Sequence, residues 1–157
     1  MTSKRAAESA TEMVQVVLPN DANPLGFILG GTVMHLIDIA GAIACHRHTR
    51  SLLVTAAVDD LQFLHPIKVG DLIILKSHVT CTFRTSLEVQ VDVFSEETLT
   101  GKRLQTSRAF LTFVAVNREG DRVSVTPLLV ETEEEKRVCE EAHARRAARL
   151  RRKAALP

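Results

Sequence analysis

Apolar residues recur along this chain with two different periods. Between residues 30 and 48 they cover nearly the whole circumference of a helix, because further apolar side chains lie between the members of one continuous stripe. That stripe consists of Val33, Ile37, Ala40 and Ala44. A helix that is apolar on nearly every side is normally buried. We therefore expect a buried helix that begins near Gly30 or Gly31 and ends near His48.

The segments after this helix alternate with period two, the spacing of a strand with one buried face. The clearest case is Leu87, Val89, Val91 and Val93, which alternate with Ser86, Glu88, Gln90 and Asp92. Asp59 and Asp60 interrupt the alternation of an earlier segment, which indicates a bulge. Residues 20–26 are rich in turn formers and predict a loop. We predict strands over residues 13–18, 54–64, 71–83, 86–93 and 104–116.

The last segment returns to a helical pattern. Thr132 followed by Glu135 matches a capping box, so we predict a helix that starts directly after Thr132. Its first turns are acidic and its last turns, from Arg145 to Lys153, are basic, which suits the helix dipole. We interpret this basic run as a solvated helix end that contacts acidic neighbours, although such runs also occur in nucleic-acid-binding proteins. The predicted divisions are a flexible N-terminal tail (1–12), one domain (13–130) and a C-terminal helix and tail (131–157).

The order of these elements places the chain in the α+β class. We expect a long central helix wrapped by an antiparallel β-sheet, with a C-terminal surface helix. One helix cannot cover both faces and both edges of a long sheet. The uncovered face or edge favours pairing with a second copy, so we expect at least a homodimer.

Composition and charge exclude several classes of function. The 157 residues suit one domain, and a formal net charge of +1 provides no strong field for nucleic acid or a membrane. The first residues contain no apolar signal segment, and the longest apolar stretch (32–45) is too short and too interrupted to span a bilayer. No H-E-x-x-H or G-x-S-x-G motif is present, so we expect neither a bound metal nor a serine nucleophile.

The three cysteines, Cys45, Cys81 and Cys139, are scattered along the chain. Disulfide frameworks and zinc sites require an even or closely spaced set. We interpret the three residues as reduced thiols of a cytoplasmic protein.

Asp38 is a carboxylate inside the predicted apolar helix. Burial of a carboxylate costs free energy and raises its pKa unless a partner compensates. Position 38 lies too far inside the helix to be an N-cap, which leaves two interpretations. Asp38 either pairs within the core or acts in catalysis near the positive end of the helix dipole. We favour the catalytic interpretation.

Several motifs, in a fixed order, resemble the cytosolic acyl-CoA thioester hydrolases of the hotdog fold. They are Pro19 to Asn23, Gly26, Gly30-Gly31, Met34, Asp38 to Ala42, Gln62 to Asp71, Phe83 to Ser86, and Arg108 to Val116. The resemblance implies a hotdog fold and hydrolysis of an acyl-CoA to a free acid and CoA. It also implies active sites shared between two protomers, with Asn23 of one facing Asp38 of the other, in dimers that often assemble into trimers of dimers.

The resemblance gives each matching residue a role. Asp38 would activate water as a general base or, alternatively, attack as a nucleophile. Asn23 would orient the water or the thioester through its amide, whereas without the motif it is a plain turn residue and Asp21 holds the loop by an Asx-turn. The backbone N–H groups of Gly30 and Gly31 would receive the thioester oxygen, the alternative being a tight turn or close helix packing.

Arg84, Thr85 and Ser86 would meet the phosphates of CoA, with a solvated hairpin turn as the alternative. Lys68 and Arg103 have less support for the same role. We therefore expect a cytoplasmic acyl-CoA thioesterase, homodimeric or a trimer of dimers, with no metal or prosthetic group and no nucleic-acid or membrane partner. Two alternatives stay open, a non-catalytic acyl-CoA-binding protein and a hotdog dehydratase of hydroxyacyl thioesters. A dehydratase relies on a His beside the helical carboxylate, and no such motif stands out here.

Overall fold

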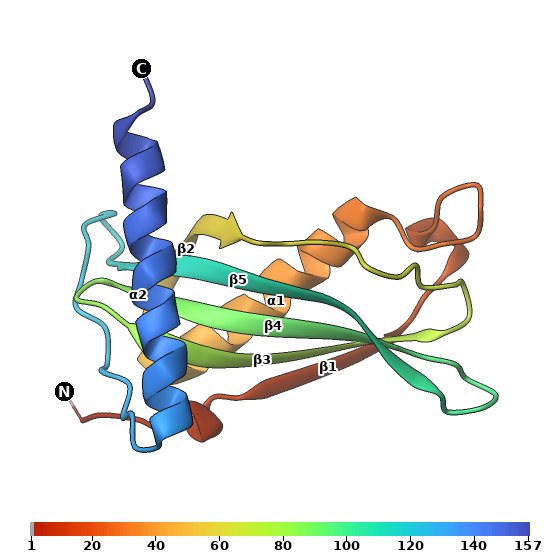
Figure 1. Cartoon of the computed structure of the whole chain (residues 1–157), viewed down its shortest axis with the longest axis horizontal. Coiled ribbons are helices and arrows are strands. Elements are labelled where there is room, and N and C mark those ends of the chain that lie inside the picture. The colour runs from red at the N-terminus through yellow and green to blue at the C-terminus, as the bar shows by residue number, and fades with distance from the viewer. Residues whose placement is uncertain (1) are drawn as a thin grey trace.

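A computed structural model describes residues 2–157 as one antiparallel sheet with a long helix on each face (Figure 1). The elements are β1 (Thr11–Val16), α1 (Gly30–Thr49), β2 (Leu52–Asp59), β3 (Leu72–Thr82), β4 (Ser86–Glu96), β5 (Arg103–Val116) and α2 (Glu133–Ala154), with 3-10 turns η1 (Ala6–Glu8) and η2 (Pro19–Asp21). The strand order is β1-β3-β4-β5-β2, so β1 and β2 are the edges. The predicted α+β fold, with a central helix wrapped by the sheet and a C-terminal surface helix, is confirmed.

The core lies between α1 and the sheet. The four apolar residues of β4, from Leu87 to Val93, are each fully buried, which confirms the predicted alternation. A Cβ at Gly41 would lie 3.1 Å from Cγ1 of Val89 and 3.4 Å from the Phe113 ring. The absence of a side chain at position 41 therefore lets the sheet close onto the helix.

α2 crosses the opposite face of the sheet and is held there by charged side chains. The guanidinium of Arg145 donates to both carboxylate oxygens of Glu88, at 2.9 and 2.8 Å, and Glu88 is 1% exposed. Arg149 donates to Asp59 at 2.9 Å. The prediction that the basic run contacts acidic neighbours is confirmed for these two arginines.

The predicted capping box begins α2. The N–H of Glu135 donates to Oγ1 of Thr132 at 3.1 Å, and the Glu135 carboxylate accepts from the N–H of Thr132. The start of this helix is therefore where the sequence pattern places it.

The predicted strand over 54–64 was wrong in its second half. β2 ends at Asp59, and Asp60 has a φ of 55°, in the left-handed region that ends a strand. The bulge lies between Thr55 and Ala57 and not at the two aspartates. Residues 60–68 form a loop instead, which brings Phe63 against the start of α1.

The interpretation of three reduced thiols was also wrong. Cys81 on β3 and Cys139 on α2 form a disulfide, and Cys45 is free and buried. The two bonded residues are 58 positions apart, so their spacing contains no sign of the bond. Only the packing of α2 across the sheet brings them together.

The N-terminal segment contacts the rest of the chain. The N–H of Lys4 donates to the carbonyl of Pro127, and its Nζ donates to the carbonyl of Arg47. β1 begins at Thr11, slightly before the predicted strand. The division of the chain at residues 12 and 130, and the flexibility of the first segment, stay predictions. Among residues 2–157, neither helix is apolar over a stretch long enough to cross a membrane.

Candidate active site

Asp38 lies in the third turn of α1, on the side that faces the edge strand β2. Oγ1 of Thr55 donates to Oδ1 of Asp38 at 2.7 Å. Asp38 is half-buried and Thr55 is exposed in the single chain, so the carboxylate is not enclosed in the core as the helix pattern suggested. The sequence analysis missed Thr55. The structure marks Thr55 only by its position at the register shift between β2 and β5, which lies between Thr55 and Ala57.

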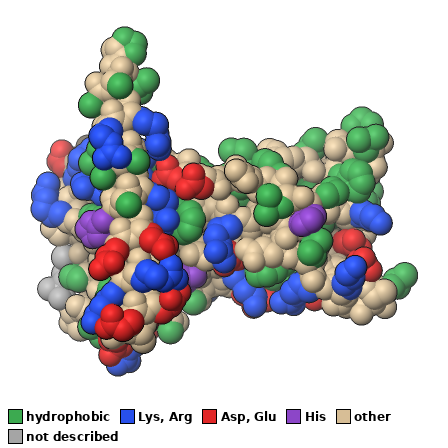
Figure 2. All heavy atoms as spheres, in the orientation of Figure 1, with side chains coloured by type: hydrophobic (Ala, Val, Ile, Leu, Met, Phe, Trp, Pro, Cys, Tyr) green, Lys and Arg blue, Asp and Glu red, His purple; other side chains and the backbone are tan. Residues whose placement is uncertain are grey.

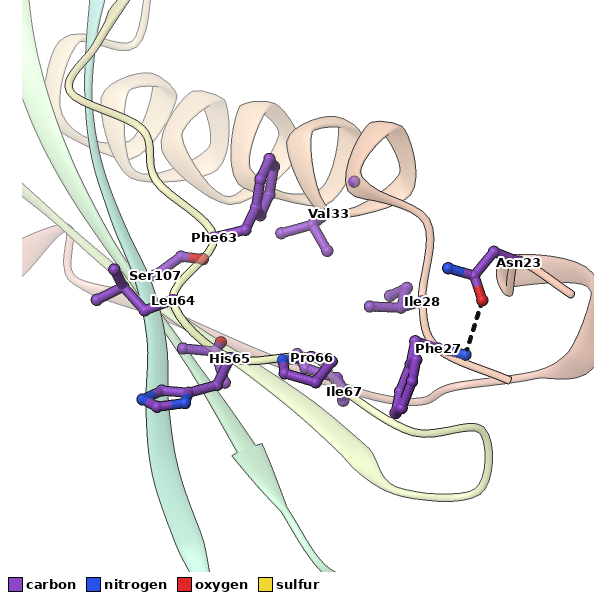
Figure 3. Close-up of a pocket in the computed structure, with 12 residues that line it drawn as sticks. Asn23, Phe27, Ile28, Val33, Phe63, Leu64, His65, Pro66, Ile67 and Ser107 are labelled. Carbon is purple, nitrogen blue, oxygen red and sulfur yellow. Dashed lines mark hydrogen bonds between the residues drawn. The ribbon is translucent and has the colours of Figure 1, made fainter. Parts of the chain in front are cut away.

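Asn23 holds the loop that leads into α1. Its Oδ1 accepts from the N–H of Leu25 at 3.0 Å and from the N–H of Phe27 at 3.1 Å. Asp21 holds the other end of the loop, since its carboxylate accepts from the N–H of Leu18. The turn-residue interpretation of Asn23 is therefore correct for its oxygen. Figure 3 shows the hydrogen bond from the N–H of Phe27 to this oxygen, and no hydrogen bond within the described residues uses the amide nitrogen, which remains available as a donor.

The first turn of α1 leaves its backbone donors free. Leu29 is the N-cap residue and provides no side-chain cap, and the first hydrogen bond of the helix runs from Val33 to the carbonyl of Leu29. Within residues 2–157, no hydrogen bond is formed by the N–H groups of Gly30 and Gly31. Free N–H groups at the positive end of a helix dipole are suited to bind an anion or a polarised carbonyl oxygen.

The two glycines differ in their surroundings. A Cβ at Gly30 would lie 3.4 Å from the ring of Phe63, which is ordinary contact at its lower limit. A Cβ at Gly31 would meet nothing within 4 Å. Gly31 therefore presents its backbone to open space in the single chain.

A cavity of about 340 Å³ adjoins the start of α1 (Figure 3). Its lining is mainly apolar, and Asn23, Gly30 and Ser107 contribute polar groups. This volume falls at the lower end of the range for small-molecule sites. Asp38 does not line it. One chain therefore brings Asn23 together with Gly30, whereas Asp38 forms a separate pair with Thr55 of β2.

The residues predicted to contact phosphates lie elsewhere. Arg84 and Thr85 lie in the turn between β3 and β4, and Ser86 is the first residue of β4, which matches the hairpin interpretation; Arg84 is exposed. Thr85 and Ser86 line a second concave surface beside the C-terminal half of α2. Arg103 is engaged in an ion pair with Glu96 at 3.0 Å.

The structure also gives the positions of Lys68 and of the histidines. Lys68 forms an isolated β-bridge with Phe27, which keeps it close to the loop of Asn23. His48 is buried at the end of α1, where its Nε2 contacts the carbonyl of Thr126 at 2.9 Å, and burial lowers its pKa. No hydrogen bond in the described chain joins a histidine to Asp38.

Among residues 2–157, three side chains lie close enough to suggest a metal site. The ligand atoms of Cys81, Cys139 and His143 lie within 4.8 Å of one another. Both sulfurs are shared in the disulfide, so they are not available as thiolate ligands in this state.

Comparisons with known proteins identify a family to which this chain is similar. Residues 25–102 match the model of the thioesterase superfamily. The acyl-CoA thioester hydrolase YkhA of Bacillus subtilis is 40% identical over 128 residues, which are 82% of this chain and 74% of the relative. The cytosolic acyl coenzyme A thioester hydrolase of Rattus norvegicus is 34% identical over 139 residues, 87% of this chain, and this chain spans only 36% of that relative's length.

Solved structures share the whole fold. A hexameric acyl-CoA thioesterase superimposes with a TM-score of 0.92 at 43% identity, over 100% of both chains. The acyl-CoA hydrolase of Staphylococcus aureus, in complex with butyryl coenzyme A and coenzyme A, superimposes with a TM-score of 0.88 at 32% identity, over 97% of this chain and 93% of the other.

Three further structures of the Staphylococcus aureus enzyme carry single alanine substitutions, of an Asn, an Asp and a Thr. In sequence order these three positions are separated by 15 and 17 residues. Asn23, Asp38 and Thr55 have the same two separations here. The coincidence groups the missed Thr55 with the two residues that the sequence analysis had selected.

Proposed function

This chain belongs to the thioesterase superfamily, and from that premise we propose that it hydrolyses acyl-CoA thioesters at a site built by two protomers. The observation that carries the mechanism is the hydrogen bond from Thr55 to Asp38, since it orients a carboxylate that no other described hydrogen bond engages. The reaction converts an acyl-CoA and water into a carboxylic acid and CoA.

Two protomers are needed because one chain separates the parts of the site. Thr55 belongs to β2, an edge strand with unpaired backbone groups, and Asp38 lies beside it. Apolar side chains at this edge are exposed, including Leu52, Val54 and Val58 at 42 to 50%. Such an edge favours pairing with a second copy. We propose that the second protomer covers this edge and brings its own Asn23 to Asp38.

Solved relatives support an assembly larger than one chain. The structural neighbour that matches the whole chain is hexameric, and so is a thioesterase of Yersinia pestis with a TM-score of 0.68 at 29% identity. We propose dimers arranged as a trimer of dimers for this protein.

The proposed chemistry uses three groups. The Asp38 carboxylate removes a proton from a water molecule, whose oxygen attacks the thioester carbon. The developing negative charge on the carbonyl oxygen is received by the free N–H groups at the start of α1, at Gly30 and Gly31. The carbon–sulfur bond then breaks, and the CoA thiolate leaves and takes up a proton. Because a thiolate leaves readily, no strong acid is needed for this step.

Asn23 contributes a donor and not an acceptor in this scheme. Its Oδ1 already accepts two backbone N–H groups, so only the amide NH₂ can contact the water or the thioester. This restricts the broader role that the sequence analysis gave to the residue.

The reaction is tested with a panel of acyl-CoAs and a dye that detects released thiol. We expect thiol release by the wild type and a loss of roughly 100- to 10,000-fold in kcat for Asp38→Asn, the range for removal of a general base. Asp121→Asn is the matched control, because this exposed carboxylate lies in the turn after β5, away from both parts of the site. Tight acyl-CoA binding without thiol release by the wild type would instead identify a non-catalytic binding protein.

A second experiment tests the shared site. Asn23→Ala and Asp38→Ala protomers are unfolded and refolded as a mixture, and we expect the mixed dimer to recover one working site of two. Each variant alone should be inactive. No recovery in a mixture that contains heterodimers would place both residues in the same site.

We propose a cytosolic location, as the names of the mammalian relatives suggest for those proteins. There the Cys81–Cys139 bond would meet a reducing thiol pool. The ion pairs of Glu88 and Asp59 would then hold α2 without the covalent link.

A further inference from the structure

Three side chains that can bind a metal ion meet where α2 crosses β3. Cys81 belongs to β3, whereas Cys139 and His143 belong to α2. One ligand atom of each residue, a sulfur or a ring nitrogen, lies within 4.8 Å of the other two. We name these three residues the Cys-Cys-His cluster. It shares no residue with the candidate active site.

The two ligands from α2 have a spacing that suits a shared ion. Cys139 and His143 are four positions apart, so they lie on the same face of the helix, one turn from each other. Two ligands at this spacing on one helix are a recurrent arrangement in zinc sites. The helix therefore presents a sulfur and an imidazole to the same point above β3.

A bulge in β3 turns the third ligand toward α2. Successive side chains of a strand normally point to opposite faces of the sheet. Thr80 and Cys81 are neighbours, yet Oγ1 of Thr80 donates to the Glu88 carboxylate on the face that α2 crosses, and Cys81 bonds to Cys139 on that same face. The register of β3 shifts between Val79 and Cys81, and such a bulge re-aims a side chain. Without it, Cys81 would face α1.

The ring of His143 is held in place but is not hydrogen-bonded. It packs edge-on against the ring of Phe83, with centroids 4.9 Å apart and an interplanar angle of 83°. Within the described chain, the histidine side chains that form hydrogen bonds are those of His46 and His48. A ring nitrogen of His143 is therefore free to bind a metal ion, and the contact with Phe83 restricts the rotation of the ring.

Reduction of the disulfide makes both sulfurs available. A low-molecular-weight thiol attacks one sulfur as its thiolate, and a second such thiol completes the exchange, which leaves two protein thiols and one disulfide of the small thiol. The Cα atoms of Cys81 and Cys139 are 4.8 Å apart. Rotation about the Cα–Cβ bonds can separate the sulfurs to roughly 3.8 Å, the spacing of two thiolates on a tetrahedral zinc ion with Zn–S bonds of about 2.3 Å.

We propose that the reduced Cys-Cys-His cluster binds one zinc ion through two thiolates and one imidazole. Zinc prefers these ligands, and its binding releases the two thiol protons. Cys81 is fully buried whereas His143 is exposed, so the fourth position of the ion faces solvent and is occupied by water.

The charge of such a site suits the middle of α2. Figure 2 shows acidic side chains gathered on the first half of this helix and basic ones on its second half, and the cluster lies between them. A zinc ion with two thiolates and a neutral imidazole has no net charge, so neither group repels it strongly. The ion replaces the disulfide as the link between β3 and α2, which fixes the helix on the sheet in both redox states. This inference does not depend on thioester hydrolysis.

The first test uses cobalt(II), which binds in place of zinc and absorbs visible light. The whole chain is reduced with a phosphine, the reductant is removed without air, and cobalt chloride is added. We expect one equivalent of cobalt per chain, with a thiolate-to-metal charge-transfer band and the d–d bands of a tetrahedral site, and displacement by zinc. The disulfide-bonded protein should show neither band. Missing bands in the reduced protein, or equal bands in both redox states, would overturn the inference.

Substitutions then identify the ligands by competition for zinc with a chromophoric chelator. Cys139→Ser and His143→Ala should each weaken binding by more than the roughly 10- to 100-fold that loss of a partner outside the ligand set costs. Cys45 stays in both variants, so retained binding cannot be hidden by its loss. His35→Ala is the matched control, because this exposed histidine on α1 lies outside the cluster, and its affinity should equal that of the wild type. Wild-type affinity in His143→Ala would refute the three-ligand site.

The second test measures the link between α2 and β3. A ligand that binds only the folded state stabilises it, so excess zinc should raise the urea midpoint of the reduced wild type. The midpoint of the disulfide-bonded protein should not change, and that of reduced His143→Ala should rise much less. An unchanged midpoint in the reduced wild type would show that the ion does not join the two elements. An equal rise in both redox states would assign the effect to zinc bound elsewhere. Either result would overturn the inference.

Discussion

α1 and α2 cover opposite faces of the same sheet, yet they are held by different interactions. α1 packs through apolar side chains and small residues, and Gly41 allows close contact with Val89 and Phe113. α2 buries only Ala142 fully, and is joined to the sheet by a disulfide and three ion pairs. The comparison shows that a helix can be held on a sheet in two ways. One is a large area of apolar contact, and the other is a small number of covalent and ionic bonds.

The two kinds of attachment differ in how they fail. Loss of one methyl group from the α1 core removes a small part of a large contact. Loss of one link under α2 leaves a buried charge or frees a long loop, so each link has a large individual effect. The following predictions test that difference, from the largest expected effect to the smallest.

Arg145→Ala should cost the most among substitutions in α2. It leaves the Glu88 carboxylate, 1% exposed, without its bidentate partner, and a broken buried pair costs roughly 3–5 kcal/mol. Urea unfolding measures the change. Arg137→Ala removes two exposed ion pairs, with Glu134 and Glu141, and should lower stability far less, because solvent screens exposed pairs. Equal costs at the two positions would mean that the buried pair does not hold α2.

Reduction of the Cys81–Cys139 bond should have the next largest effect. The bond closes a loop of 58 residues, for which the chain-entropy model gives about 4 kcal/mol as an upper value. Unfolding with and without a phosphine reductant measures it, and Cys139→Ser should remove the response to the reductant. Titration of thiols in denaturant should find one without reductant, since Cys45 alone is free, and three with it. Three thiols without reductant would contradict the disulfide.

A valine at two positions of α1 tests the importance of contact area. Gly41→Val overpacks the space against Val89 and Phe113 and should destabilise the fold by roughly 1–3 kcal/mol. Gly31→Val adds the same atoms where nothing lies within 4 Å, so stability should change little. Activity should fall in the second variant, because the substrate is proposed to approach the backbone there. Unchanged activity of Gly31→Val would contradict that approach.

Acidification should have the smallest effect. Burial lowers the pKa of His48 at the end of α1, and likewise that of His78, which lines the concave surface beside the start of α2. A lowered folded-state pKa means that the unfolded chain binds the proton more readily. The two neutral histidines therefore leave the fold at full stability above the unfolded-state pKa of about 6.5. The free energy of unfolding falls as the pH drops below that value, because the unfolded chain takes up the protons first. Chemical unfolding between pH 7.5 and 5 should show this loss, and His48→Gln/His78→Gln should flatten the profile. A variant profile as steep as that of the wild type would assign the effect to other groups.

The sequence patterns whose predictions were confirmed are all local. The circumference of α1, the alternation in β4 and the Thr132 capping box depend on residues within a few positions of one another. Each pattern reflects the geometry of a single element, so it is present in the sequence before any tertiary contact forms.

Errors occurred where a distant residue decides the outcome. β2 stops at Asp59, whose carboxylate is held by Arg149, 90 positions away. The Asp38 side chain faces Thr55 and the edge of the sheet, although the helix around it is apolar on nearly every side.

The sequence by itself determined the α+β architecture, the two helix starts, the family resemblance, and the selection of Asn23, Gly30, Gly31 and Asp38. Only the tertiary structure decided that Thr55 orients Asp38, that Cys81 joins Cys139, and that the basic end of α2 encloses a pocket. Periodicity and capping result from backbone geometry over one or two turns, so they are visible in the order of residues. Pairing between side chains depends on how the sheet, its twist and both helices come together, and no spacing along the chain encodes that distance.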